Sequence, residues 1–272
     1  MARHNGDWNW QRVRSPFARL YYVVEGSAEI IFSKSSCRLT PGKLYLVPPF
    51  TTHSNRCDGL FTHYYIHVYE PADSVSGLFE DYTLPCEVKA EPTDEWLFQR
   101  LCAINSGKLL PESDPRSYDN PEMLLRSVTS GRTYSLAEKM ESDGIISLLL
   151  ARFLANATST RSHDDTRIQR TRRHIRKNIS RNIPIDTLAD MACLSKDHFI
   201  RLFKKECGES PVRYINHRKI ELAETMLITT SMTIKQIADE LGFSDYSYFT
   251  RLFHKTTGTA PAHYRKRAVK RK

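Results

Sequence analysis

The sequence predicts an α+β chain of two domains: a small antiparallel β-barrel with following helices, and an all-α domain built from one helical unit used twice. Short β-rich runs separated by turns fill residues 17–70, a density of strands typical of small barrels. Residues 199–214 and 249–264 repeat one another, which indicates a duplicated supersecondary unit. The net charge of +9 is uneven: residues 161–272 carry +12 and residues 1–160 carry −3. A chain of 272 residues with this asymmetry is expected to have two domains.

The barrel strands are recognised by β-branched and aromatic residues between turn signals. Gly26-Ser27 separates the first two strands, and Pro48-Pro49 ends the third. The expected strands are Tyr21–Val24, Glu29–Phe32, Lys43–Val47 and Phe61–Tyr69.

A turn signature lies within these strands. Gly42 is followed by Pro48 and then by His53, a spacing that resembles the second motif of the cupin barrel. Phe50 stands where that motif usually has Gly, and Cys57 where it often has Asn. The resemblance implies a cupin-like effector domain.

The metal-binding half of the cupin pattern is missing, because no histidine lies between His4 and His53. His63 and His67 do not replace it, since residues four apart in a strand lie ~13 Å apart, whereas metal–ligand bonds are about 2 Å long. We therefore expect no metal and no cofactor; a metal site is the less favoured alternative.

The strand over Phe61–Tyr69 alternates between an apolar face, with Tyr64 and Ile66, and a His/Tyr face, with His63 and His67. We expect the apolar face to line the barrel interior, where a small molecule would bind. Ordinary core or surface packing is the alternative for every candidate. The candidate ligand-binding residues are Tyr22, Tyr45, His53, Tyr64 and Ile66.

The middle of the chain is expected to be helical. Helices are predicted over Asp94–Ile104, Pro121–Val128 and Leu136–Leu154. The last has more apolar side chains than one barrel face requires, which leaves a dimer interface and helix-on-barrel packing open as alternatives.

The domain boundary follows from composition. Residues 1–155 form the expected effector-sensing and dimerisation domain, and the polar residues 156–166 the linker. Residues 167–272 form the second domain, which begins with a basic helix over Arg167–Arg181.

Each repeat is expected to be two short helices joined by a tight turn. In the first, Ile185–Cys193 is followed by Ser195 as N-cap and by a helix over Lys196–Cys207. In the second, the turn is Gly242-Phe243-Ser244, and Gly258 closes the last helix. Eight identities relate the copies at an offset of fifty residues: Phe199, Arg201, Leu202, Phe203, Lys205, Gly208, Pro211 and Tyr214.

A short helix, a turn and an exposed basic helix form the plan of the helix-turn-helix, whose second helix enters the DNA major groove. A tandem helical repeat with solvated faces is the alternative. Residues 183–267 resemble the DNA-binding domain of the AraC/XylS family, on the pattern Ile237-Ala238, Gly242-Phe243, Tyr248-Phe249, Phe253, Gly258, Pro261 and Tyr264-Arg265. The resemblance implies about seven helices, with a central helix over Pro211–Leu227 that packs on both units.

The exposed faces of the two second helices supply the candidate DNA contacts. Arg201 and Arg251 match base-contacting arginines of the family, and arginine most often pairs with guanine. Lysines there are expected to contact phosphates. The full set is Lys196, Asp197, Ile200, Arg201, Lys204, Lys205, Tyr246, Ser247, Thr250, Arg251 and Lys255.

These observations favour a transcriptional regulator controlled by a small-molecule effector, with promoter DNA, RNA polymerase and a second copy of the chain as partners. The six cysteines contain no C-x-x-C pair, and the sequence shows no secretory signal or transmembrane run, so a reduced, cytoplasmic protein without membrane association is expected. The less favoured alternatives are a cupin-type oxygenase or isomerase fused to a DNA module, a DNA-repair fusion, and redox sensing by one thiol.

Overall fold

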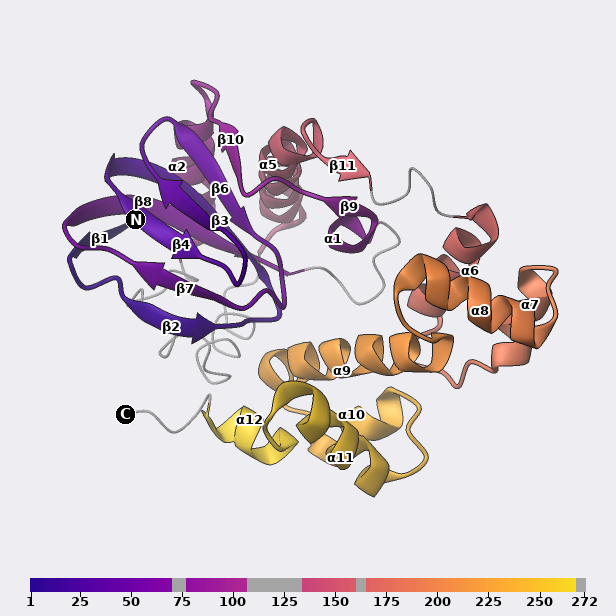
Figure 1. Ribbon diagram of the computed structural model, residues 1–272. Coiled ribbons are helices and arrows are strands. Elements are labelled where there is room, and N and C mark those ends of the chain that lie inside the picture. Colours follow the sequence, from indigo (N-terminus) through magenta and orange to yellow (C-terminus); the bar gives the residue numbers. More distant parts are fainter. Residues whose placement is uncertain (70–76, 107–133, 160–164, 268–272) are drawn as a thin grey trace. The chain divides into compact units, whose positions relative to one another are not determined.

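The protein is described by a computed structural model over residues 1–69, 77–106, 134–159 and 165–267 (Figure 1). The chain divides into two compact units. The N-terminal unit consists of Met1–Tyr69 and Tyr82–Ser159, and the C-terminal unit of Glu70–Asp81 and Thr160–Lys272. The C-terminal unit therefore includes a short segment from the first half of the chain, which lies within the expected N-terminal domain 1–155.

The N-terminal unit contains two antiparallel sheets. The five-stranded sheet has the order β1 (Ala2–Asn5), β8 (Leu60–Val68), β3 (Ala18–Gly26), β6 (Lys43–Val47), β10 (Glu87–Lys89). The four-stranded sheet has the order β2 (Trp10–Val13), β7 (His53–Arg56), β4 (Ala28–Ile31), β5 (Ser36–Leu39). Gly26 links β3 to β4 with φ +76°, and a Cβ there would overlap the Leu60 carbonyl, so only glycine fits this turn.

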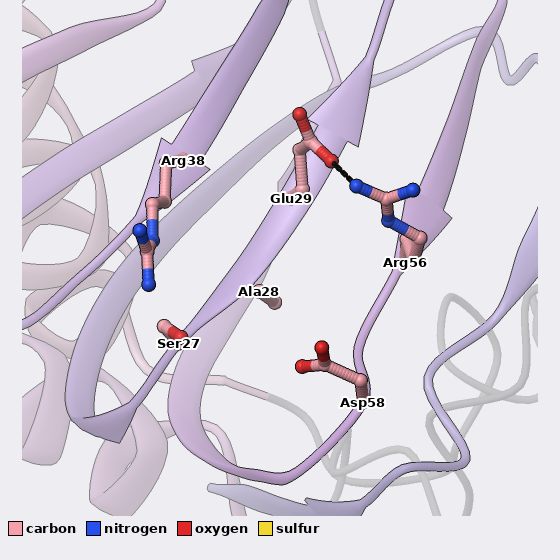
Figure 2. Close-up of a pocket in the computed structure, with 6 residues that line it drawn as sticks. All are labelled: Ser27, Ala28, Glu29, Arg38, Arg56 and Asp58. Atoms are coloured by element: carbon pink, nitrogen blue, oxygen red, sulfur yellow. Dashed lines mark hydrogen bonds and ion pairs between the residues drawn. The ribbon is translucent and has the colours of Figure 1, made fainter.

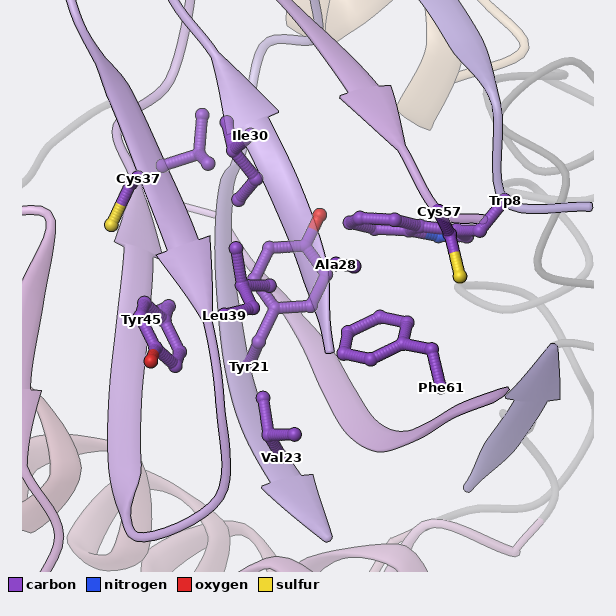
Figure 3. Close-up of a cluster of buried hydrophobic side chains, with 11 residues drawn as sticks. Trp8, Tyr21, Val23, Ala28, Ile30, Cys37, Leu39, Tyr45, Cys57 and Phe61 are labelled. Atoms are coloured by element: carbon purple, nitrogen blue, oxygen red, sulfur yellow. The ribbon is translucent and has the colours of Figure 1, made fainter. Parts of the chain in front are cut away.

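The core lies between the two sheets (Figure 3). Within the described residues no hydrogen-bonded ladder joins one sheet to the other, so the arrangement is a two-layer sandwich and not the closed barrel expected from the strand density. The strands β10 and β5 remain as free edges of their sheets. The buried residues of this cluster are Trp8, Tyr21, Val23, Ala28, Ile30, Cys37, Leu39, Tyr45, Val47, Cys57 and Phe61.

The side-chain alternation of β8 is the reverse of the expectation. The register pairs Tyr65 with the core residue Tyr21, and His63 with Val23, so the His/Tyr face is the interior one. Tyr64 lies instead against Phe98, with ring centroids 6.2 Å apart. The expectation failed because a helix covers the other face of this sheet, so both faces are packed and apolar character does not identify the interior.

Two helices accompany the five-stranded sheet. The helix α2 (Asp94–Ile104) and the helix α5 (Leu136–Leu154) have the bounds predicted from the sequence. They are held together by Arg100, which makes two hydrogen bonds of 2.6 and 2.9 Å to Glu141. The helix α5 starts at a capping box formed by Ser135 and Glu138. The helix predicted over Pro121–Val128 lies outside the described residues.

Both ends of the expected linker 156–166 take part in secondary structure. Thr158–Ser159 is the strand β11, which pairs with β9 (Tyr82–Thr83) in the N-terminal unit. At the other end, Asp165 caps the next helix through its side chain.

The C-terminal unit is helical. Its elements are α1 (Leu78–Asp81), α6 (Thr166–Lys177), α7 (Ile185–Met191), α8 (Lys196–Cys207), α9 (Pro211–Thr229), α10 (Ile234–Glu240), α11 (Tyr246–Thr257) and α12 (Pro261–Arg267). Helix α6 is four residues shorter at its C-terminus than predicted, and α8 has the predicted bounds. Figure 1 shows α9 running between the group α6–α8 and the group α10–α12.

Candidate nucleic-acid interface

The first helix-turn-helix motif consists of α7, a turn and α8. The turn closes through a 3.0 Å bond from the Leu194 amide to the Ala189 carbonyl. Cys193 adopts the left-handed conformation there, with φ 54°. Phe199 and Phe203 of α8 are fully buried against the first core cluster, each stabilising the motif by roughly 1.5–3 kcal/mol. The paired aromatic residues therefore anchor α8 and leave its other side to solvent.

The second motif, α10 and α11, has the same construction. Gly242 occupies the left-handed position with φ 67°, and the Phe243 amide closes the turn on the Ala238 carbonyl at 3.0 Å. Asp245, not Ser244, is the N-cap of α11, and it accepts hydrogen bonds from the amides of the first turn. The turn amides Leu194 and Phe243 are 49 residues apart, whereas the N-caps Ser195 and Asp245 are 50 apart, so the second copy has one extra residue between turn and helix.

The two copies place equivalent residues in equivalent surroundings. From Phe199 and from Phe249 onward, the sequence of buried, half-buried and exposed positions is identical over twelve residues. Arg201 and Arg251 are both exposed, as the repeat predicts. Arg251 makes a loose 4.0 Å contact with the exposed Asp245, a pair that contributes little in water. The guanidinium is therefore free to move to a ligand.

Most of the predicted DNA-contacting side chains lie on these open faces. Ile200 is an exception, because it is half-buried and packs against the first core cluster. Thr250 is also half-buried, and its hydroxyl donates to the Tyr246 carbonyl at 3.0 Å. The exposed ones are Lys196, Asp197, Arg201, Lys204, Lys205, Tyr246, Ser247, Arg251 and Lys255.

Helix α9 fixes the two motifs relative to each other. Tyr214 and Ile215 in its first half belong to the first core cluster, and Ala223 and Leu227 in its second half belong to the second. Leu222 packs against both clusters. At 1.5 Å per residue, the 19-residue helix is roughly 28 Å long. The sequence-based expectation of a central helix that packs on both units is confirmed.

A buried ion-pair cluster in the C-terminal unit was not predicted. Asp81, at the end of α1, lies 3.7 Å from a guanidinium nitrogen of Arg172 and 3.4 Å from one of Arg176, both on α6. All three side chains are largely buried. A single aspartate ninety residues upstream carries no sequence signal that marks it as part of this unit.

The predicted ligand residues of the N-terminal unit separate into two groups. Tyr45 and His53 lie in the interior of the sandwich, and the Tyr45 hydroxyl accepts a 2.8 Å bond from the Thr40 amide. Tyr22, Tyr64 and Ile66 lie on the face toward α2, where the Tyr22 hydroxyl donates to Glu95 at 3.2 Å. The five residues therefore do not line one site.

The interior His53 has an unusual environment. Burial and the nearby Arg19 lower its pKa to about 4, so the ring is neutral at pH 7. Its Nδ1 lies 3.0 Å from the Thr51 carbonyl and therefore carries the proton. The Nε2 is a buried acceptor without a hydrogen-bond partner among the described residues.

Two hollows open on the N-terminal unit. The first, of about 300 Å³, lies over the four-stranded sheet, where Arg56 bonds Glu29 at 2.6 Å beside Arg38 and Asp58 (Figure 2). The second, of about 600 Å³, lies at the edge strands β5 and β10 and is lined by residues such as Phe32 and Cys86. Of the five predicted ligand residues, which all lie in the described part of the chain, none lines either hollow.

Comparison with known proteins agrees with the duplicated motif. Residues 188–267 match the family model described as a helix-turn-helix domain. These residues form a helix-turn-helix domain. The chain is 32% identical over 94 residues to the MmsAB operon regulatory protein of Pseudomonas aeruginosa, covering 35% of this chain and 31% of the relative. It is 28% identical over 174 residues to the arabinose operon regulatory protein of Escherichia coli K12, covering 63% and 59%.

The chain thus spans less than two thirds of the length of these relatives. Among solved structures, the DNA-binding domain of AdpA in complex with a target DNA gives a TM-score of 0.36 at 22% identity, covering 36% of this chain and 89% of that one. ToxT from Vibrio cholerae O395 gives 0.47 at 16% identity, covering 99% and 96%. The resemblance to AraC/XylS regulators, stated from the sequence, is confirmed for the helix-turn-helix domain.

The described residues also bear on metal binding and on membrane insertion. No group of three or more His, Cys, Asp or Glu side chains is placed to hold a metal ion there. No helix there is long and apolar enough to cross a membrane.

Proposed function

We propose that this protein is a transcriptional regulator that binds promoter DNA through α8 and α11 and responds to a small-molecule effector in its N-terminal unit. The observation that carries the proposal is the duplicated exposed face, with Arg201 and Arg251 at equivalent positions on two anchored helices. The +12 charge of residues 161–272 supports it, because lysine and arginine neutralise backbone phosphates. The relatives named above are regulators and not enzymes, which favours this function over the cupin-type enzyme.

Arg201 and Arg251 read base edges in this proposal, and the neighbouring lysines bind phosphates. Binding sites selected from random DNA by the full-length protein supply the test substrate. Arg201→Ala is expected to weaken binding to a selected site about 5- to 150-fold relative to scrambled DNA, the effect of ~1–3 kcal/mol of base discrimination. Lys204→Ala is the matched control, since it should weaken both DNAs equally and reduce the salt slope by about one. Equal losses on both DNAs for Arg201→Ala would contradict base reading.

The effector is proposed to bind in the N-terminal unit near His53. The neutral ring offers an unpartnered buried Nε2 acceptor, and a buried acceptor without a partner costs stability that a hydroxyl-bearing ligand would relieve. The ring centroids of Phe32 and His53 lie 6.3 Å apart, and Phe32 lines the 600 Å³ hollow. A ligand could therefore reach His53 from this hollow.

A thermal-shift screen of hydroxylated metabolites tests the effector site. A ligand at 100 times its Kd should add about 2.7 kcal/mol to the unfolding free energy of the unit. His53→Phe should remove this stabilisation, and Tyr64→Phe, on the other face of the sheet, should leave it intact. Retention of the effect in His53→Phe would place the site elsewhere.

A homodimer through α5 is proposed as the assembly, with RNA polymerase as a further partner and the cytoplasm as the location. The apolar side chains Leu136, Met140 and Leu148 are 74%, 66% and 52% exposed. At about 100° per residue Leu136 and Met140 lie opposite the buried Ile145 and Leu149, and Leu148 lies at the border between the two faces. Exposed apolar stripes of this kind mark interfaces.

Sedimentation analysis tests the assembly. Met140→Glu combined with Leu148→Glu should convert a dimer into a monomer, because each charge would be buried in the interface. The exposed Lys139→Glu, outside the stripe, is the control. A wild-type monomer at micromolar concentration would refute the dimer and leave DNA binding untouched.

A further inference from the structure

Two cysteines far apart in the sequence meet at the open seam of the sandwich. Cys37 lies on β5, the edge strand of the four-stranded sheet, and Cys86 directly precedes β10, the edge strand of the five-stranded sheet. The Cys37 sulfur lies 4.0 Å from Oε2 of Glu87, the residue next to Cys86, and the two thiols are close enough to shift each other's pKa. Both line the 600 Å³ hollow, and both are reduced. The seam that lacks a hydrogen-bonded ladder is therefore bridged by a pair of thiols.

The arrangement differs from that of Cys57, which belongs to the same core cluster. The Cys57 thiol donates to the Gly59 carbonyl at 3.0 Å. Figure 3 shows the sulfurs of Cys37 and Cys57 at opposite ends of the cluster, with the Cys37 sulfur directed away from the other side chains. Cys37 thus faces the hollow, whereas Cys57 is engaged by backbone.

We propose that Cys37 and Cys86 form a reversible disulfide when a peroxide enters this hollow, so that oxidation covalently joins the two sheets at their open edge. The disulfide would modify the same hollow that leads toward His53, and the proposal rests neither on DNA binding nor on the identity of an effector.

The local electrostatics assign the roles of the two sulfurs. The hydrogen bond from Cys86 lowers the pKa of Cys37, and Lys43 acts in the same direction, against the opposing effects of burial and Glu87. The hydrogen bond given to Cys37, together with burial, raises the pKa of Cys86. Cys37 is therefore the attacking thiolate, since the thiolate is the nucleophilic form, and Cys86 is the resolving thiol.

The chemistry balances in two steps. The Cys37 thiolate attacks one peroxide oxygen; an S–O bond forms, the O–O bond breaks, and hydroxide leaves and takes up the proton lost by Cys37 to give water. The Cys86 sulfur then attacks the Cys37 sulfenic acid; the S–S bond forms, the S–O bond breaks, and the departing hydroxide takes the Cys86 proton. Two thiols and one hydrogen peroxide give one disulfide and two waters.

The test uses the full-length chain, reduced and then treated with one to two equivalents of hydrogen peroxide. Thiol titration after denaturation should fall from the six cysteines of the sequence by two. Digestion with trypsin alone leaves Cys57 and Cys86 in one peptide, because no Lys or Arg lies between them; adding a glutamate-specific protease separates them. The expected product is a linked pair of peptides containing Cys37 and Cys86, lost after dithiothreitol.

Variants and stability add independent readouts. Cys86→Ser should leave Cys37 as a sulfenic acid that dimedone traps, and Cys57→Ser should still form the Cys37–Cys86 link. Closing a loop of about 50 residues should raise the thermal midpoint of the oxidised N-terminal unit by at least several degrees. If a variant misfolds, the peptide map of the oxidised wild-type protein still tests whether Cys37 and Cys86 are linked. Oxidation confined to the exposed Cys193, or a link between other cysteines, would overturn the proposal.

Discussion

The Asp81 cluster makes the stability of the C-terminal unit depend on the first half of the chain. The Asp81 side chain is 3% exposed, and those of Arg172 and Arg176 are 9% and 12% exposed. Replacement by asparagine leaves two buried guanidinium groups without this carboxylate. Breaking a buried ion pair costs about 3–5 kcal/mol, and the nitrogen–oxygen distances of 3.4–3.7 Å place the loss near the lower end. We expect Asp81→Asn to lower the unfolding free energy of the C-terminal unit by about 3 kcal/mol.

The two units can be monitored separately in one sample. The three tryptophans, Trp8, Trp10 and Trp96, all lie in the N-terminal unit, so tryptophan fluorescence reports its unfolding. Circular dichroism at 222 nm reports mainly the C-terminal helices. At roughly 4 °C per kcal/mol, Asp81→Asn should lower the circular-dichroism midpoint by about 12 °C and leave the fluorescence midpoint in place.

Asp186→Asn is the matched control, because Asp186 makes an exposed 3.1 Å pair with Lys196 that should contribute less than about 1 kcal/mol. The reasoning is refuted if Asp81→Asn shifts the helical transition no more than Asp186→Asn does. A fragment of residues 161–272 lacks Asp81 and should be destabilised by a similar amount, while it keeps salt-sensitive DNA binding.

Two further predictions concern buried histidines and turn glycines. Burial lowers the pKa of His53 to about 4 and those of His63 and His67 well below their usual value. Below about pH 6.5 the unfolded chain therefore binds protons that the folded unit excludes, and the unfolding free energy should fall toward pH 4 by up to ~1.4 kcal/mol per pH unit per histidine. Equal stability in urea at pH 7 and pH 5 would contradict this. Gly242→Ala should destabilise the C-terminal unit by more than Gly258→Ala. Both glycines have positive φ, but only a Cβ at Gly242 would press on the backbone, 3.1 Å from a carbonyl oxygen. Equal thermal midpoints for the two variants would show that the backbone moves to relieve this contact.

The elements with strong local signals were predicted with their bounds. The helix α5 begins at the Ser135–Glu138 capping box, and α8 ends at the left-handed Gly208. In both cases the residues next to the helix end determine where it lies. The strand β6 is bounded by Gly42 and Pro48 in the same way. The short strands β1, β2, β5 and β7 were missed, because hydrogen bonding to neighbouring strands stabilises them more than their own residues do.

The candidate DNA interface could be predicted because the chain contains it twice. Repetition identified the buried Phe199 and Phe249 and, with them, the exposed Arg201 and Arg251. Ile200 was expected to be exposed and is half-buried, since its burial depends on the neighbouring cluster and not on its position in the helix alone.

By itself, then, the sequence determined the two helix-turn-helix motifs, their central helix and the helices α2 and α5, because caps, turns and 3.6-residue periodicity are local properties. Only the tertiary structure decided which face of β8 is interior, that Asp81 belongs to the C-terminal unit, and that Cys37 meets Cys86. Each of these depends on contacts between segments tens of residues apart. Side-chain alternation and composition specify what a segment can bury, but the partner that covers it is set by how the whole chain packs.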